Sequence, residues 1–289
     1  ANVDRTLSLT SESAGELHAL LLLGDASING MGSDALVDAS DDAAHAHLAI
    51  GADNGSIYLW RLRGLLSGSK SLASKPSLAL SGHTAAVLQL ATLPSDHPAA
   101  SQMSGNGDEQ LLVSASKDRS IRVWRLDASM EGGGPLLCLP SAHRDVVRAL
   151  TLVDTQMYST GRDKTLRLWE SGGDESSAGS GSGGWVCARS LAAHTDEVLA
   201  LASRSGGAWP RHATKQLGGD GGLLFSASRG GEVRIWDRES LVCLDAWVVH
   251  SSAIHALLVR DDCLISASGD GSIAVARAAP KSGVPPQTA

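Results

Sequence analysis

A repeated frame limits what this chain can fold into. Four stretches each run through a polar turn into alternating apolar residues and end at a tryptophan. They are Gly51–Trp60, Ser114–Trp124, Ser159–Trp169 and Ser226–Trp236, and a fifth, Ser266–Ala276, has the same frame without the tryptophan. Apolar residues at every second position are typical of a strand with one buried face. A frame that returns about every 40–45 residues, with two longer intervals that require insertions, predicts copies of one small sheet.

A histidine introduces most of the copies. It lies four residues before the first apolar residue of another alternating run, as His83 does before Val87. The first copy has Ser13 at this place. A short apolar run also precedes each histidine. We therefore expect four strands per copy, which we letter a to d: a follows the histidine, b ends at the serine, c ends at the tryptophan, and d leads to the next histidine.

The order His…Ser-x-x-x-Asp-x-x-x-x-x-Trp within a four-strand unit resembles the WD-repeat (WD40) family of β-propellers, over about residues 6–277. The resemblance implies an all-β fold, a β-propeller of four-stranded antiparallel blades. Five WD-type repeats are visible, so the chain is either five-bladed or part of a seven-bladed ring. The propeller is expected over residues 1–279, with blades at about 14–76, 77–134, 135–184, 185–239 and 240–279. A strand at 6–9 closes a neighbouring blade or the last one, and 280–289 is a flexible tail.

The resemblance also implies that histidine, serine, aspartate and tryptophan form a hydrogen-bonded network inside each blade. By position the network residues are His83, Ser114, Asp118, Trp124, His143, Ser159, Asp163, Trp169, His194, Ser226, Trp236, His250, Ser266 and Asp270. Gly230 replaces the aspartate in the fourth unit, and Ala276 replaces the tryptophan in the fifth. The first unit keeps only Trp60. These departures predict incomplete networks in three of the units.

A serine, a histidine and an aspartate could also form a catalytic triad. Catalysis needs one constellation at one pocket, whereas this set recurs from unit to unit, which favours a buried structural network. The sequence has no G-x-S-x-G elbow, H-E-x-x-H motif or phosphate-binding loop that would indicate an enzyme. We therefore predict a protein that is not an enzyme, with no catalytic residues and no cofactor.

Composition narrows the classes of partner. The four cysteines show no C-x-x-C pair and no metal-ligand spacing, so they predict no metal site and are expected to be buried as small apolar residues. No apolar run approaches the roughly 18–20 residues of a membrane span, and we expect no membrane partner. The net charge of −7 makes nucleic acid an unfavourable partner. An intracellular location is expected, with cytoplasm and nucleus both open.

Basic residues gather at the turns between strands b and c and beside one histidine loop. In a meander these turns share one end of the propeller, while the long insertions fall at the other end. The partner-binding candidates at this end are Lys117, Arg119, Arg144, Arg162, Lys164 and Arg229. Arginine matches acidic and phosphorylated groups well, although exposed turns carry such residues in any case. We expect these side chains to be exposed and free of ion-pair partners. Trp209, in an insertion, is a separate candidate anchor for a partner.

These features predict a non-catalytic WD-repeat scaffold for protein–protein interaction within a larger multi-subunit assembly. The alternative is a recognition module for acidic or phosphorylated peptides, for example a ubiquitin-ligase substrate receptor, that uses the basic turns. Other proteins or peptides are the expected partners in both cases.

Overall fold

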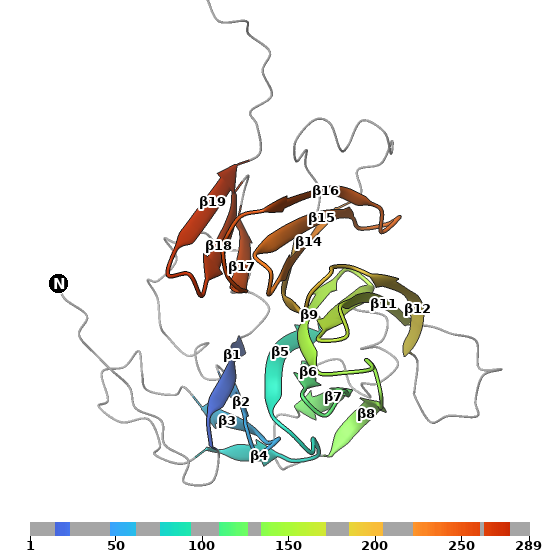
Figure 1. Ribbon diagram of the computed structural model, residues 1–289. Coiled ribbons are helices and arrows are strands. Elements are labelled where there is room, and N and C mark those ends of the chain that lie inside the picture. Colours follow the sequence, from blue (N-terminus) through green and yellow to red (C-terminus); the bar gives the residue numbers. More distant parts are fainter. Residues whose placement is uncertain are drawn as a thin grey trace, which may run out of the picture. The chain divides into compact units, whose positions relative to one another are not determined.

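The computed structural model describes residues 15–23, 47–61, 76–93, 110–126, 134–171, 185–204, 222–260 and 263–277. These residues form strands and turns only, and the strands assemble into five antiparallel sheets (Figure 1). Within the same ranges no helix is long and apolar enough to cross a membrane. The expected strand 6–9, the tail 280–289 and Trp209 lie outside the described residues.

The chain divides into two compact units, and the first comprises residues 1–147 and 170–186. It contains two complete sheets. The first sheet consists of β1 (Leu17–Leu23), β2 (His47–Ala52), β3 (Ile57–Arg61) and β4 (Leu78–Leu80). The second sheet consists of β5 (Val87–Leu93), β6 (Gln110–Ser116), β7 (Ile121–Leu126) and β8 (Pro135–Leu139).

The second unit comprises residues 148–169 and 187–289. The third sheet, most of which belongs to it, consists of β9 (Val147–Val153), β10 (Gln156–Gly161), β11 (Thr165–Ser171) and β12 (Trp185–Ala192). The fourth sheet consists of β13 (Val198–Arg204), β14 (Leu223–Ser228), β15 (Glu232–Asp237) and β16 (Cys243–Val248). The fifth has three strands in the described part of the chain: β17 (Ile254–Arg260), β18 (Cys263–Ser268) and β19 (Ile273–Arg277).

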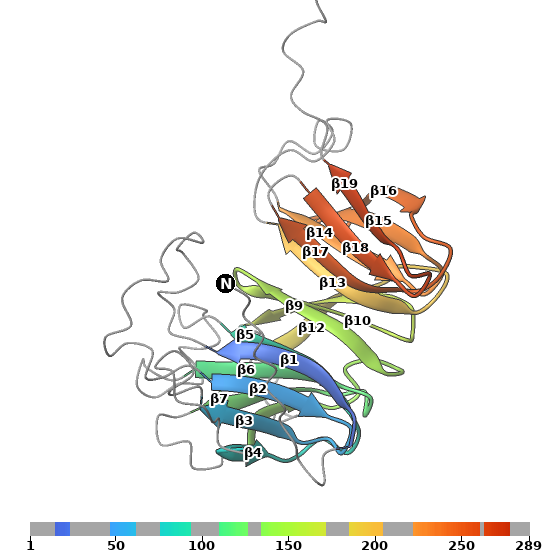
Figure 2. The ribbon, with the colours of Figure 1, turned by 90° about the vertical axis from the view of Figure 1, so that its left-hand side faces the viewer.

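In every sheet the spatial order of the strands follows the chain, so each sheet is an antiparallel meander. Figure 2 shows this order for β1 to β4 of the first sheet. The prediction of an all-β propeller built from antiparallel blades is therefore confirmed, with five blades. The outer strand belongs to the preceding blade, however: β4 pairs with β3, although the sequence boundary at 77 separates the two. The lettered order a to d therefore matches each four-stranded sheet, and only the expected blade bounds are offset by one strand.

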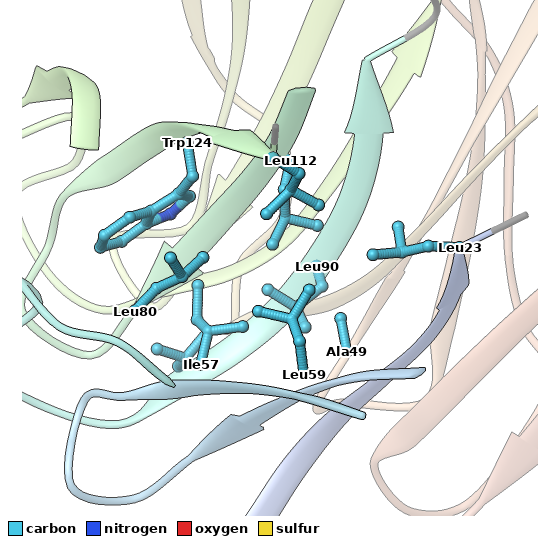
Figure 3. Packing of buried hydrophobic residues seen from close by; sticks show 10 residues of the cluster. Leu23, Ala49, Ile57, Leu59, Leu80, Leu90, Leu112 and Trp124 are labelled. Atoms are coloured by element: carbon cyan, nitrogen blue, oxygen red, sulfur yellow. The ribbon is translucent and has the colours of Figure 1, made fainter. Parts of the chain in front are cut away.

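The core lies between consecutive sheets of a unit. One face of the first sheet presents Ile57 and Leu59, which pack with Leu90, Leu112 and Trp124 of the second sheet (Figure 3). The fourth and fifth sheets share a similar cluster in the second unit. Because side chains of a strand alternate between its faces, the period of two in the sequence places one apolar set on each face. Each sheet can therefore pack on both sides.

The turn between the second and third strands of each sheet has a conserved backbone geometry within this chain. The third residue of this turn adopts a left-handed conformation in the second to fifth sheets, with φ between 64° and 82°. In chain order these residues are Arg119, Lys164, Gly231 and Gly271. In the first sheet Gly55 occupies the same place with φ 83°. At Gly231 a Cβ atom would clash with the carbonyl oxygen of His250, whereas at Gly271 a Cβ atom would meet nothing within 4 Å. At Gly231 a larger residue would both clash with His250 and adopt an unfavourable backbone conformation, whereas at Gly271 only the backbone conformation favours glycine.

Substituting these two glycines separates the two effects. Gly271→Ala should lower the free energy of unfolding by about 1–2 kcal/mol, the usual cost of left-handed backbone for an L-residue. Gly231→Ala should cost more, because the new methyl group also displaces the His250 carbonyl. Urea denaturation of both variants measures the difference. Equal losses would show that the close approach of His250 is relaxed without cost.

Candidate functional site

The second sheet contains a hydrogen-bonded chain of four side chains. The Trp124 ring N–H donates to Ser114 Oγ over 2.8 Å, and Ser114 Oγ lies 2.7 Å from His83 Nε2. His83 Nδ1 lies 2.9 Å from Asp118 Oδ2. Ser120 donates to the other carboxylate oxygen through both its backbone N–H and its hydroxyl. These hydrogen bonds therefore join strands β6 and β7 to the loop that precedes β5.

The partners determine the direction of these hydrogen bonds. Burial alone would raise the pKa of Asp118, but hydrogen bonds from His83 and Ser120 outweigh it and hold that pKa well below its usual range. An ionised Asp118 can only accept, so the His83 Nδ1–H donates to it, and Nε2 accepts from the Ser114 hydroxyl. Every polar side-chain hydrogen of Trp124, Ser114 and His83 in this network thus has an acceptor.

The same geometry argues against a catalytic role for Ser114. Its side chain is fully buried, and its oxygen already accepts from Trp124 and donates to His83. A catalytic serine needs an oxygen that can reach a substrate carbonyl. The arrangement therefore resembles a triad in its residue types, while its position in the interior fits a structural role.

The fourth sheet completes the network with a residue that the positions of the repeat do not assign. His194 Nε2 lies 2.7 Å from Ser226 Oγ, and Trp236 donates to the same oxygen over 2.8 Å. The carboxylate comes from Glu232, whose Oε2 lies 2.9 Å from His194 Nδ1. The expectation of an incomplete network, based on Gly230, is therefore wrong for this sheet.

Glu232 reaches the histidine because of its register. It stands two residues after Gly230, the place that Ser120 holds in the second sheet, and its longer side chain spans the extra distance. A Cβ atom at Gly230 would lie 3.9 Å from Asp196 Oδ2, so an aspartate at position 230 would bring two carboxylates together. At the equivalent position the second, third and fifth units have serine or threonine. The glutamate in the fourth unit is the sequence signal that could have identified this residue.

The fifth sheet binds its histidine in the same way but has no tryptophan. His250 Nε2 lies 2.8 Å from Ser266 Oγ, and Nδ1 lies 3.2 Å from Asp270 Oδ2. Hydrogen bonds from Ser272 are the main cause that lowers the pKa of Asp270. In the network of this sheet, Ala276 provides no ring N–H.

The first and third sheets show two further variants. In the third, the Trp169 ring N–H donates to Ser159 Oγ over 2.8 Å, and Asp163 accepts from Thr165. His143 is buried. In the first sheet Ile50 replaces the serine, and the buried Trp60 ring N–H has no hydrogen-bond partner among the described residues.

The basic turn residues are all exposed, as expected. In the first unit Lys117 Nζ lies 3.5 Å from Asp53 Oδ1. The expectation that these cations lack ion-pair partners is therefore wrong for Lys117. Arg119 and Arg144 are the other two candidates that this unit presents.

The second unit brings arginines together around one carboxylate. Glu197, in the loop before β13, is buried, and its carboxylate lies 2.9 Å from Arg162, 3.5 Å from Arg229 and 3.8 Å from Arg148. The expectation of unpaired cations is wrong here too, because Glu197 was not considered. We call Arg148, Arg162, Arg229 and Glu197 the arginine cluster.

The arginine cluster keeps an excess of positive charge. Three guanidinium groups face a single carboxylate, and Arg162 and Arg229 are each more than half exposed. Two of the three distances exceed hydrogen-bond length, so the guanidinium N–H groups are not all engaged by Glu197. Lys164 instead donates to the backbone carbonyl of Thr195 over 2.8 Å. The exposed guanidinium groups of Arg162 and Arg229 are thus the part of the cluster that faces solvent.

The cysteines differ from expectation. All four are free thiols, but Cys243 is exposed and the other three are only half-buried. Three of them lie on the fourth strands β8, β12 and β16, and Cys263 begins β18. The described residues include no group of three or more His, Cys, Asp or Glu side chains arranged to hold a metal ion.

Comparison with known proteins places this geometry in a family. Residues 74–125 and 185–237 match the family model described as "WD domain, G-beta repeat". A solved structure, the computationally designed Ika8 protein, superposes with a TM-score of 0.51 at 22% identity, over 80% of this chain and 55% of that one. At this identity the likeness shows the fold alone.

Relatives in sequence are longer proteins. The human kinesin-like protein KIF21A is 23% identical over 78% of this chain and 11% of its own length. Cell division control protein 4 of Candida albicans is 24% identical over 59% of this chain and 24% of its own length. Zebrafish (Danio rerio) WD repeat-containing protein 55 is 33% identical over 22% and 16%. The chain thus spans less than a quarter of each of these relatives.

Removing the carboxylate of the second-sheet network tests its structural role. Asp118→Ala should lower the free energy of unfolding by about 1–3 kcal/mol, because it leaves buried donors of His83 and Ser120 without an acceptor. Glu239→Ala, which removes an exposed carboxylate, should change it by less than about 0.5 kcal/mol. Thermal or urea unfolding measures both. An Asp118→Ala protein as stable as the wild type would contradict the role.

The fourth-sheet histidine should make stability depend on pH. Burial lowers the pKa of His194 from its usual 6.5 more than the hydrogen bond to Glu232 raises it. The unfolded chain therefore takes up a proton that the folded chain refuses, and stability falls as pH drops below about 6.5. The loss is at most about 1.4 kcal/mol per pH unit for one group. Urea unfolding between pH 7.5 and 5.5 should show a shallower dependence in His194→Gln, and an unchanged dependence would contradict this assignment.

Proposed function

Because this chain belongs to the WD-repeat β-propeller family, whose members generally serve as protein-interaction scaffolds, we propose that it binds an acidic or phosphorylated segment of a partner protein. The observation that carries the proposal is the arginine cluster of the second unit. In this cluster three arginine side chains surround one buried carboxylate, that of Glu197.

The chemistry of the cluster favours an anion. Buried Glu197 holds the arginines in position, which reduces the conformational entropy that binding would otherwise cost. The side chains of Arg162 and Arg229 are more than half exposed, so a ligand in solvent can reach them, and a phosphate or carboxylate can accept two hydrogen bonds from one guanidinium. Asp196, next to Glu197, adds negative charge beside the cluster. Binding therefore depends on a ligand placed over the guanidinium groups and away from this loop.

The proposed activity is recognition without catalysis. The network serines of the second and fourth sheets are fully buried with their oxygens occupied, which supports a protein that is not an enzyme. The net charge of −7 supports a protein partner over nucleic acid.

A second candidate function is a scaffold within a multi-subunit assembly. Its support is that the relatives, among them a kinesin-like protein and a cell division control protein, are several times longer than this chain. A propeller within such a protein would connect other parts through its exposed turns. This role and peptide recognition can coexist, since a scaffold also needs a surface that selects its partner.

Charge reversal tests the arginine cluster. The probe is a library of acidic and serine-phosphorylated peptides beside their neutral counterparts, with affinity measured by fluorescence anisotropy. The wild type should prefer the charged peptides, and Arg162→Glu combined with Arg229→Glu should weaken the best of them at least tenfold, on the order of 1.4 kcal/mol. Binding should also weaken as salt rises, because exposed charges are screened beyond about 8–10 Å.

Arg260→Glu is the matched control, since Arg260 is an exposed arginine at the end of β17 and outside the cluster. It should leave affinity unchanged. Equal binding of charged and neutral peptides, or full affinity in the double variant, would overturn the proposal.

A further inference from the structure

Glu197 is the acidic member of the arginine cluster, and its position in the fold does not require a carboxylate. Its backbone carbonyl accepts the N–H of Arg229, the first residue of the turn, over 2.8 Å. In the second and fifth sheets Ala86 and Ala253 accept the equivalent N–H over 2.9 Å. In the first sheet Glu16 stands at this place, but it is exposed. Because alanine satisfies the backbone role, the carboxylate of Glu197 acts on the arginines.

The backbone around Glu197 is also held without its carboxylate. The Glu197 N–H donates to Asp196 Oδ1 over 2.8 Å. Two residues before Glu197, the backbone carbonyl of Thr195 accepts from Lys164 Nζ over 2.8 Å. These hydrogen bonds, with the one from Arg229, tie the loop to the turns of the third and fourth sheets. Removing the charge of Glu197 should therefore leave the loop in place.

The carboxylate lies among the three guanidinium groups. Glu197 Oε1 is 2.9 Å from Arg162 Nε and 3.5 Å from Arg229 Nη1, and Oε2 is 3.8 Å from Arg148 Nη2. The side chain of Glu197 is 10% exposed, whereas those of Arg162 and Arg229 are 54% and 61% exposed. Water screens a buried charge less than an exposed one. Glu197 therefore offsets part of the positive charge of the cluster before any ligand arrives.

We infer, on the basis of the proposed function, that Glu197 determines the specificity of the arginine cluster by weakening its attraction for every anion. Three guanidinium groups less one carboxylate leave two net positive charges. The Coulomb energy of a ligand is proportional to its own charge, so a single carboxylate gains about half of what a doubly charged group gains. A phosphorylated side chain is close to doubly charged at pH 7. The ligand class that this balance favours is thus a phosphorylated segment over a merely acidic one.

Glu197→Gln tests the role of the charge, because the amide keeps the shape of the side chain. The probes are three peptides with the tightest-binding sequence of the library above, carrying phosphoserine, glutamate or alanine at one position, and fluorescence anisotropy at pH 7.5 gives their affinities. The variant should bind the glutamate peptide about threefold and the phosphoserine peptide about ninefold more tightly than the wild type does, since twice the ligand charge doubles the change in binding free energy. The alanine peptide should bind equally to both proteins.

Two further variants separate charge from geometry. Glu239→Gln makes the same chemical change at an exposed carboxylate outside the cluster, and it should leave all three affinities unchanged. Glu197→Asp keeps the charge but shortens the side chain, and it should bind no more tightly than the wild type. If Glu197→Gln does not fold, Glu197→Ala replaces it, because alanine stands at this place in two other sheets, and it should also bind the charged peptides more tightly.

The outcomes distinguish this inference from the proposed function. A wild type that prefers charged peptides, without a gain in Glu197→Gln, would overturn the role of Glu197 and leave the proposed function standing. Equal gains for all three peptides, or the same gain in Glu197→Asp, would overturn the role of the charge. No preference for charged peptides in either protein would overturn both. A preference that appears only in Glu197→Gln would support the role of Glu197 and contradict the proposed function of the wild type.

Discussion

The buried serine hydroxyl is the interaction on which each complete blade depends. In the second and fourth sheets one oxygen accepts the tryptophan ring N–H and donates to the histidine, so it joins the second strand, the third strand and the loop before the first. Such a network stabilises only when every member is satisfied, since an orphaned buried donor costs about 1–3 kcal/mol. Where Ile50 replaces the serine, Trp60 has no partner among the described residues, and aliphatic packing must hold that sheet.

The sequence contained enough to predict the strands, their order and the sheets that they form, because the period of two and the recurring turn are local signals. It did not show which side chains meet across a turn. Glu232 was missed because positional matching assigned the carboxylate to the Gly230 column, whereas reach and register decide which group contacts His194. Glu197 was missed for a similar reason, since its three arginines come from β9 and two separate turns. Contacts of this kind depend on how neighbouring sheets pack.

The turn between the second and third strands connects the internal network with the side chains proposed to bind a partner. Its left-handed residue presents a carbonyl to the next histidine loop, as Lys164 does to the backbone N–H groups of Ala193 and His194. The residue at its start points outward, and in the third and fourth sheets it is an arginine of the cluster. The internal network therefore fixes the backbone from which the binding side chains project. The proposed recognition would then need little reorganisation of the backbone, which would favour affinity for a charged segment.

The proposed recognition and the packing of the sheets draw on different parts of the repeat. Peptide recognition would use turn residues and the charge of Arg162 and Arg229, whereas the strand faces that join neighbouring sheets within a unit are apolar. Salt should weaken the first interaction through screening and leave the second largely intact, because apolar burial does not depend on charge. The repeat can therefore carry a selective charged contact without weakening the packing that holds its sheets together.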